Sequence, residues 1–313
     1  MQRTSKFSSR SLVALAVYIV LLWGGGKCES KVLSWLLPLL RDHLHLSFKA
    51  IGQQRPAVPV NVLTAIVLVR LVAVLLATLV AAGIERRPWR CFGYGSRGAA
   101  KPLVMGGLLG FAAISVVMAL MAASHALIFD GRMLHGAAVF HYGLRWLAGL
   151  MLVGVVEEGT DRAYPLVTIA RSFGMVPAVL LTSLVFAWGH AGNPGEGFLG
   201  LLQVFLFGTV CALSVFRTGS IWWAVAFHGI WDWAQEFFYG TLGSGYWFDG
   251  HLFQFRAQGN VLLSGGTVGP EGSLYVFLVL GALLAYEIVW QSRNSGAWPG
   301  LLLQRDPSCA GNG

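Results

Sequence analysis

The stretch LRWLAGLMLVGVVEEGTDRAYPLVTIA, residues 144–170, decides the fold class of this chain. It exceeds the roughly 20 residues that a helix needs to cross the hydrocarbon core of a bilayer. However, Glu157, Glu158 and Arg162 lie within it. Ionisable side chains at membrane depth are costly and usually face a protein interior or a wet cavity. The stretch therefore predicts a membrane helix with a charged inner face that handles protons or water.

The composition of the whole chain points to the same class. Of its 313 residues, 56% are hydrophobic and only 12% are charged, whereas a soluble domain carries about 25% charged residues. An aqueous surface cannot be built from so few charges. The apolar runs also lack the alternation that strands of a membrane barrel require. The sequence therefore predicts an all-α, polytopic membrane protein.

About eight transmembrane helices are expected. The predicted spans are residues 11–26, 57–83, 102–129, 144–170, 176–190, 198–216, 220–239 and 273–291. No A-x-A-like cleavage site follows the first one, so we expect it to remain as an uncleaved span. With the N-terminus inside, Lys and Arg are more frequent in the cytoplasmic connections. We expect a multi-pass protein of the cell membrane with both termini in the cytoplasm, and no nucleic-acid partner despite the net charge of +8.

The chain divides into three predicted regions. Residues 1–140 hold three spans and no chemical motif, and residues 141–240 hold every motif described below. Residues 241–313 comprise a Gly-rich loop, the last transmembrane helix and a tail. The four cysteines have no C-x-x-C spacing, so we expect neither a zinc ribbon nor a disulfide framework; they are Cys28, Cys91, Cys211 and Cys309.

The first motif is Glu157-Glu158-x-x-x-Arg162. On a helix Glu158 and Arg162 lie one turn apart in the favourable acid-before-base order, whereas Glu157 lies about 100° around the helix. The two carboxylates therefore need not share a role. The alternative is that these charges mark a helix end at the membrane surface, with Arg162 as an anchor on the cytoplasmic side.

Two further motifs, Phe186-x-x-x-His190 and His228-x-x-x-Asp232, lie in later apolar runs. His190 taken alone fits a helix cap, and His228 with Asp232 fits a pair that stabilises one helix. Together with the glutamates they fit a hydrolase that activates water. A carboxylate in a pocket of low polarity is a good general base, a histidine can relay the proton, and further donors can stabilise an oxyanion.

The order E-E-x-x-x-R, F-x-x-x-H, H-x-x-x-N/D resembles the CAAX-protease and bacteriocin-processing (CPBP, or Abi) family, which includes the Rce1-type prenyl proteases. The neighbouring stretches 186–194 and 218–223 support the resemblance. It implies a Rce1-like helical bundle and an intramembrane endopeptidase that needs no cofactor. Its substrate would be a peptide or a membrane protein within the lipid bilayer.

The resemblance also implies roles for the motif residues. Glu157 would activate water with His190 as its partner, and His228 with the residue four positions later would stabilise the oxyanion. Glu158 and Arg162 would support the site. That later residue is Asp232, where the prenyl proteases have Asn. Asp232 either donates a hydrogen bond to the oxyanion in its protonated form or orients His228.

Other functions compete with this interpretation. Two histidines and a carboxylate make a plausible catalytic zinc set, so a zinc metalloprotease is the alternative enzyme, although the H-E-x-x-H pattern is missing. A non-catalytic membrane immunity or scaffold protein is a second alternative. A proton-coupled transporter is a third, but its usual internal repeat is not found in the sequence.

Overall fold

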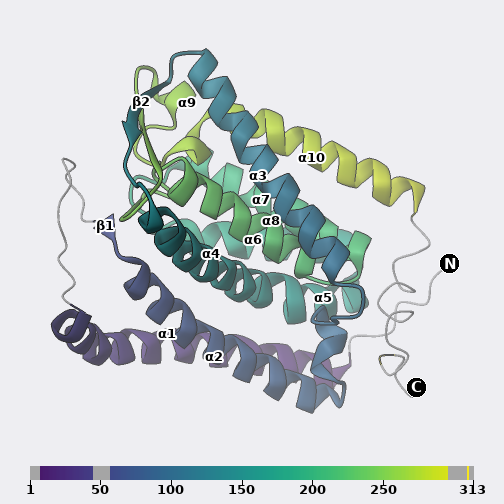
Figure 1. The fold of residues 1–313 in the computed structure, drawn as a ribbon. Coiled ribbons are helices and arrows are strands. Elements are labelled where there is room, and N and C mark those ends of the chain that lie inside the picture. The colour runs from purple at the N-terminus through teal and green to yellow at the C-terminus, as the bar shows by residue number, and fades with distance from the viewer. Residues whose placement is uncertain (1–7, 45–56, 295–308, 310–313) are drawn as a thin grey trace.

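The apolar stretches form helices because a backbone in hydrocarbon must satisfy its hydrogen bonds within its own segment. The computed structural model describes residues 8–44, 57–294 and 309, and its helices pack into a bundle (Figure 1). The longer helices are α1 (Ser9–Leu44), α2 (Val60–Glu85), α3 (Ala100–Ala123), α4 (Ala137–Glu158), α5 (Tyr164–Phe173), α6 (Met175–His190), α7 (Phe198–Thr218), α8 (Trp222–Asp232) and α10 (Leu274–Arg293).

Shorter elements join them. They are the strands β1 (Ala57–Val58), β2 (Leu127–Arg132), β3 (Trp247–Phe248) and β4 (Phe253–Ala257), the 3-10 helices η1 (Trp89–Phe92) and η4 (Pro270–Gly272), the π-helices η2 (Gly159–Ala163) and η3 (Trp233–Phe238), and the single-turn helix α9 (Val261–Ser264).

The prediction of an all-α, polytopic membrane protein is confirmed. Within the described part of the chain, six helical segments are long and apolar enough to cross a membrane; they are Ser9–Gly26, Val60–Glu85, Ala100–Ala123, Ala137–Phe173, Phe198–Thr218 and Leu274–Arg293. Two of the predicted spans give shorter helices. Helix α6 has 16 residues, and the stretch 220–239 divides into α8 with 11 residues and η3 with 6. Because protein surrounds most of α8, its length is not set by the bilayer.

The third predicted span ends earlier than expected. The apolar run 102–129 was predicted to be helical throughout, but α3 ends at Ala123 and β2 begins at Leu127. Strand β2 pairs antiparallel with β4, and β1 pairs parallel with β3. Residues 127–129 are apolar because they form a strand at the end of the bundle, where both small sheets lie (Figure 1). Apolar content alone did not distinguish this strand from a continuing helix.

Helix α8 packs unusually closely against α3 and α4. A Cβ atom at Gly106 or Gly110 of α3 would overlap the carbonyl oxygens of Trp223 and Phe227, respectively. On the other side, a Cβ at Gly154 of α4 would lie 2.7 Å from the carbonyl oxygen of Val225. Small residues allow helix backbones to approach each other in membrane proteins. These glycines therefore fix the position of α8, which carries His228 and Asp232.

One disulfide was not expected from the sequence. Cys91 of η1 bonds to Cys309 across 218 residues, so the expectation that the cysteines form no disulfide is wrong for this pair. The pairing depends on where the fold brings the tail, which spacing does not reveal. Cys91 lies in a connection that the charge distribution places in the cytoplasm, where disulfides are rare. The orientation of the chain therefore stays a prediction.

The contact between α3 and α8 gives a test of the packing. Gly110→Ala should lower the free energy of unfolding by about 1–3 kcal/mol through overpacking, although alanine is the better helix former by about 0.5–1 kcal/mol. Thermal unfolding in detergent would measure the change. The matched control is Gly281→Ala in α10, where a Cβ meets nothing within 4 Å. If both variants unfold at the wild-type temperature, the glycine contact does not determine the packing of α8.

Candidate active site

The first motif lies where the fourth predicted span changes its helical geometry. Glu157 and Glu158 end α4, and the five residues of η2 form a π-helix before α5 continues the same run. Single π-turns within α-helices are frequent at functional sites. Glu158 and Arg162 are both 0% exposed. The alternative in which these charges mark a helix end at the membrane surface is therefore wrong.

Arg162 is surrounded by groups that compensate its buried charge. Its Nε lies 3.4 Å from Oε2 of Glu158, and its Nη1 lies 3.7 Å from Oδ2 of Asp161. The guanidinium also lies over the ring of Phe186, 3.9 Å from the centroid. Gly208 of α7 leaves the space for this group, because a Cβ there would overlap Nη2 of Arg162. A buried cation with two carboxylates and an aromatic face is held in one position.

Two tyrosines that the sequence analysis did not single out support the π-helix. A π-turn alters the intrahelical hydrogen bonding, and the Tyr18 hydroxyl donates to the carbonyl of Thr160 at 2.9 Å and to that of Gly159 at 3.3 Å. The Tyr94 hydroxyl donates to the Gly159 carbonyl at 3.4 Å. The N-terminal region therefore contributes to the site, although its sequence carries no chemical motif. In the sequence, the only indication of this support is a tyrosine within the first apolar stretch, Tyr18, and this indication is weak.

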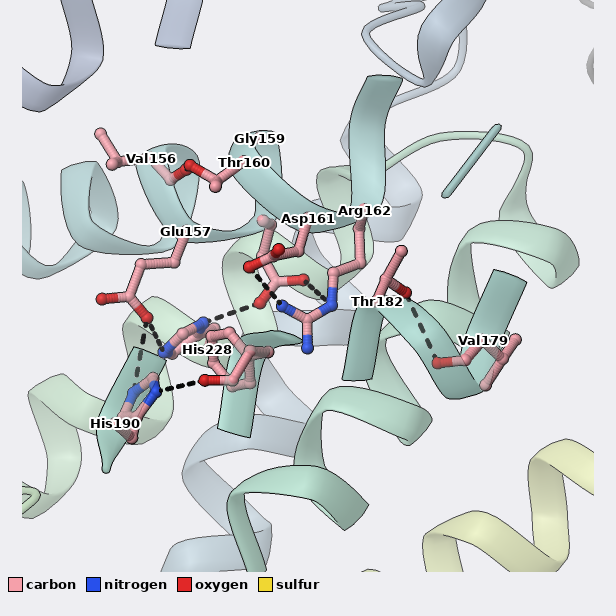
Figure 2. Close-up of polar contacts among 12 residues, drawn as sticks. Val156, Glu157, Gly159, Thr160, Asp161, Arg162, Val179, Thr182, His190 and His228 are labelled. Atoms are coloured by element: carbon pink, nitrogen blue, oxygen red, sulfur yellow. Dashed lines mark hydrogen bonds and ion pairs between the residues drawn. The ribbon is translucent and has the colours of Figure 1, made fainter. Parts of the chain in front are cut away.

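His228 is held from its inner side by Glu158. Its Nδ1 lies 2.9 Å from Oε1 of that carboxylate, so Nδ1 carries a proton and donates. Its Nε2 then faces Oε2 of Glu157 at 3.7 Å and Oδ2 of Asp232 at 3.5 Å. Figure 2 shows Glu157 and Arg162 on different sides of His228. The two neighbouring glutamates thus contact opposite nitrogens of one imidazole, as expected from their different directions on the helix.

His190 is held by its own helix. Its Nδ1 lies 2.8 Å from the carbonyl oxygen of Phe186. Because a carbonyl only accepts, Nδ1 carries the proton, and Nε2 of the neutral ring is an acceptor. That Nε2 faces Oε2 of Glu157 at 3.9 Å, too far for a direct hydrogen bond (Figure 2). The Phe186-x-x-x-His190 motif therefore works as one unit that sets the tautomer of the histidine.

All four predicted catalytic residues line one cavity of about 370 Å³, and they are Glu157, His190, His228 and Asp232. A second cavity of about 330 Å³ lies between α1, α2, α4 and α6. Glu157 and His190 line both cavities. The pair can therefore be approached from two directions, which suits a reaction between two different molecules.

The zinc alternative has no ready-made site in this arrangement. Within residues 8–44, 57–294 and 309, no three side chains of His, Cys, Asp or Glu come together in a way that could hold a metal ion. His228 also uses Nδ1 to donate to Glu158, which leaves only Nε2 as a possible ligand atom. The expectation of a cofactor-free site stays a prediction.

The buried ion pair leads to a stability test. Arg162→Ala should strand Glu158 without a counter-ion, and breaking a buried pair typically costs about 3–5 kcal/mol. Its unfolding temperature in detergent should therefore fall well below that of the wild type. Glu157→Ala is the control, because its carboxylate is 28% exposed and is not part of the pair with Arg162. Equal unfolding temperatures for Arg162→Ala and wild type would show that the pair does not stabilise the fold.

One comparison with known proteins identifies the segment that carries this site. Residues 139–234 match the family model described as "Type II CAAX prenyl endopeptidase Rce1-like". No curated protein and no solved structure matches the chain significantly. The matched segment contains all three motifs and runs from α4 to the start of η3. Over this segment the chain is similar to the Rce1-type CAAX prenyl endopeptidases, in agreement with the resemblance of its three motifs to the CPBP family.

Proposed function

We propose that this protein is an intramembrane endopeptidase in which Glu157 activates the water that hydrolyses a peptide bond. The observation that carries the proposal is the pairing of two acceptors, the Glu157 carboxylate and Nε2 of His190, which face each other at 3.9 Å. Water offers two hydrogens, and two acceptors at this spacing can each take one. The oxygen of the water is then directed into the cavity with its lone pairs free for attack.

The proposed reaction begins with proton transfer. Glu157 takes one proton from the water as the oxygen attacks the carbonyl carbon of the substrate, and a tetrahedral oxyanion forms. The same proton then passes from Glu157 to the leaving nitrogen, so the carboxylate is regenerated. His190 holds the water in line. Its tautomer is fixed by the Phe186 carbonyl, so it accepts from the water and does not compete with it for Glu157.

The oxyanion would be stabilised by His228 and Asp232. Glu158 accepts from Nδ1 of His228, so Nε2 can donate to the oxyanion only when the ring carries a second proton as an imidazolium. Asp232 lies 3.5 Å from Nε2. A fixed donor in a site with little water stabilises developing negative charge more strongly than it would in bulk water. We therefore propose the orienting role for Glu158 and the donor role for Asp232 in its protonated form.

The substrate in this proposal is a peptide segment at or within the membrane. The protein is an integral membrane protein, and we place it in the cell membrane with both termini in the cytoplasm, in keeping with the positive charge of its predicted inside connections. The printed name of the matched family makes a prenylated peptide with a C-a-a-X ending the first substrate to test. A zinc enzyme remains the alternative, and inhibition by a strong chelator would favour it.

The central test is the removal of the proposed base. Glu157→Gln keeps the shape of the side chain but cannot accept the proton, so cleavage should fall by about 10²–10⁴-fold. The rate can be measured with the purified protein and a prenylated C-a-a-X peptide. Should wild type not cleave that peptide, proteomics of a Glu157→Gln strain against wild type should reveal uncleaved precursors.

Two comparisons complete this test. His190→Ala and His228→Ala should lose activity similarly, whereas Glu85→Gln should not, because Glu85 lies outside the cavity and an amide oxygen can still accept from Tyr164. All variants must insert into the membrane and fold. Full activity in the Glu157, His190 or His228 variant would refute the assigned roles.

A second test separates the roles of Asp232 and Glu158. Asp232→Asn keeps a donor that needs no added proton, so activity should stay within about tenfold of wild type and extend to higher pH. Glu158→Gln should reduce the rate much further, because it removes the charge that holds His228 and compensates Arg162. A pH–rate profile of each variant measures both effects. Collapse of Asp232→Asn at every pH would instead assign the orienting role to Asp232.

A further inference from the structure

The cavity beside the proposed catalytic residues has an acidic wall that the mechanism does not use. Beyond Glu157 and Asp232, the carboxylates of Glu236 and Glu271 also line it. Arg70 is the only Lys or Arg among its lining residues in the described part of the chain, and it also lines the second cavity, which Glu236 and Glu271 do not reach. Carboxyl groups therefore outnumber cationic side chains at the end of this cavity away from Arg70.

Glu236 is the most unusual member of this wall. It is only 7% exposed, and its Oε2 has no hydrogen-bond partner among the residues that the structure describes. Gly243 leaves space for it, because a Cβ there would overlap Oε1 of Glu236. A buried carboxylate without a partner is costly. Such a group is neutral while the cavity is empty and gains a counter-charge when a cation enters.

Glu271 also lines this cavity, and it contacts the residue next to Gly243. Its Oε2 accepts from the backbone N–H of Ser244 at 2.8 Å and from the Ser244 hydroxyl at 2.9 Å. Burial and the negative charge of Glu271 also raise the pKa of the Glu196 carboxyl to about 7. Negative charge is thus concentrated here, and Glu271 is held in place by the loop that follows η3.

We propose that Glu236 and Glu271 form a subsite that binds the side chain of a lysine or arginine of the substrate. The proposal rests on the protease function proposed above. An ammonium or guanidinium group between these carboxylates would make charge-assisted hydrogen bonds, which are the strong ones in proteins. The stem of such a side chain is apolar and would pack against the cavity wall formed by Phe248 and Val58.

The position of the subsite sets where the basic residue lies. Glu236 follows His228 by eight residues, four in α8 and four in the π-helix η3. This corresponds to at most about 12 Å along the helix axis. An extended peptide advances about 3.3 Å per residue, and a lysine side chain covers part of the distance. The basic residue should therefore lie roughly two to four residues from the bond that is cleaved. A metal ion is a poorer occupant, because no three acidic or histidine side chains of the described residues are arranged to hold one.

The test compares substrates that differ in one side chain. A series of peptides would carry lysine, arginine, acetyl-lysine, norleucine or glutamate at each position within four residues of the cleaved bond. For wild type, the kcat/KM for lysine should exceed that for norleucine or acetyl-lysine by about tenfold or more at one position, as expected for a charge-assisted contact. A flat profile across all positions would overturn the proposal without using any variant.

Variants then locate the subsite. Glu236→Gln and Glu271→Gln keep the shape of each side chain, and each should reduce the lysine-to-norleucine ratio of kcat/KM toward one. Asp130→Asn is the matched control, because Asp130 pairs with Arg256 on the β2–β4 sheet and does not line the cavity. Its ratio should equal that of wild type. An unchanged ratio in both Gln variants, or an equal loss in Asp130→Asn, would contradict the assignment.

A binding measurement separates this proposal from the protease function. The unfolding temperature of the purified protein should rise more with a lysine peptide than with its acetyl-lysine counterpart, and Glu236→Gln should abolish the difference. If the lysine peptide stabilises but no peptide is cleaved, the subsite stands and the protease function fails. If peptides are cleaved without preference for lysine, and the lysine peptide does not selectively stabilise the protein, the protease function stands and the subsite fails. Stabilisation by calcium chloride in place of the lysine peptide would make this a metal site and overturn the proposal.

Discussion

The buried charge of Arg162 is the constraint on which the rest of the site depends. A guanidinium with no exposed surface needs counter-charges. Glu158 at the end of α4 and Asp161 in the π-helix supply them, while Phe186 covers its face. Glu158 has a second oxygen, and this one holds His228. The pair that neutralises Arg162 therefore also orients an imidazole of the site. Phe186 links the same cluster to the second histidine, because its carbonyl fixes the tautomer of His190.

Close helix packing brings this cluster together with the third motif. Helix α8 is too short to span a bilayer and lies between α3 and α4, whose glycines allow backbone contact. A side chain in place of Gly110 or Gly154 would push α8 away and move His228 from Glu158. In hydrocarbon the hydrophobic effect does not drive helices together, so packing at this distance is what holds them. The position of the candidate site on α8 thus depends on glycines, which have no functional group.

The molecule separates its charges along the bundle. Arginines are concentrated in the connection between α2 and α3, whereas the small sheets lie toward the other end of the bundle (Figure 1). A positive substrate group would be drawn into the cavity and would meet Glu236 and Glu271 beyond the reacting centre. In the proposed function, the same cavity would hold both the reacting groups and the acidic subsite for the substrate.

The sequence by itself determined the fold class, the helical stretches and the three motifs, because apolar length and charge placement are local properties. It also predicted that Glu157 and Glu158 point in different directions, since this follows from helical periodicity. It did not predict the π-helix, the strand at Leu127 or the disulfide of Cys91, nor the support from Tyr18. Each of these depends on a partner far away in the chain. Only the tertiary structure placed Glu158 against His228 and brought Glu236 into the cavity, because those contacts arise from helix packing and not from spacing.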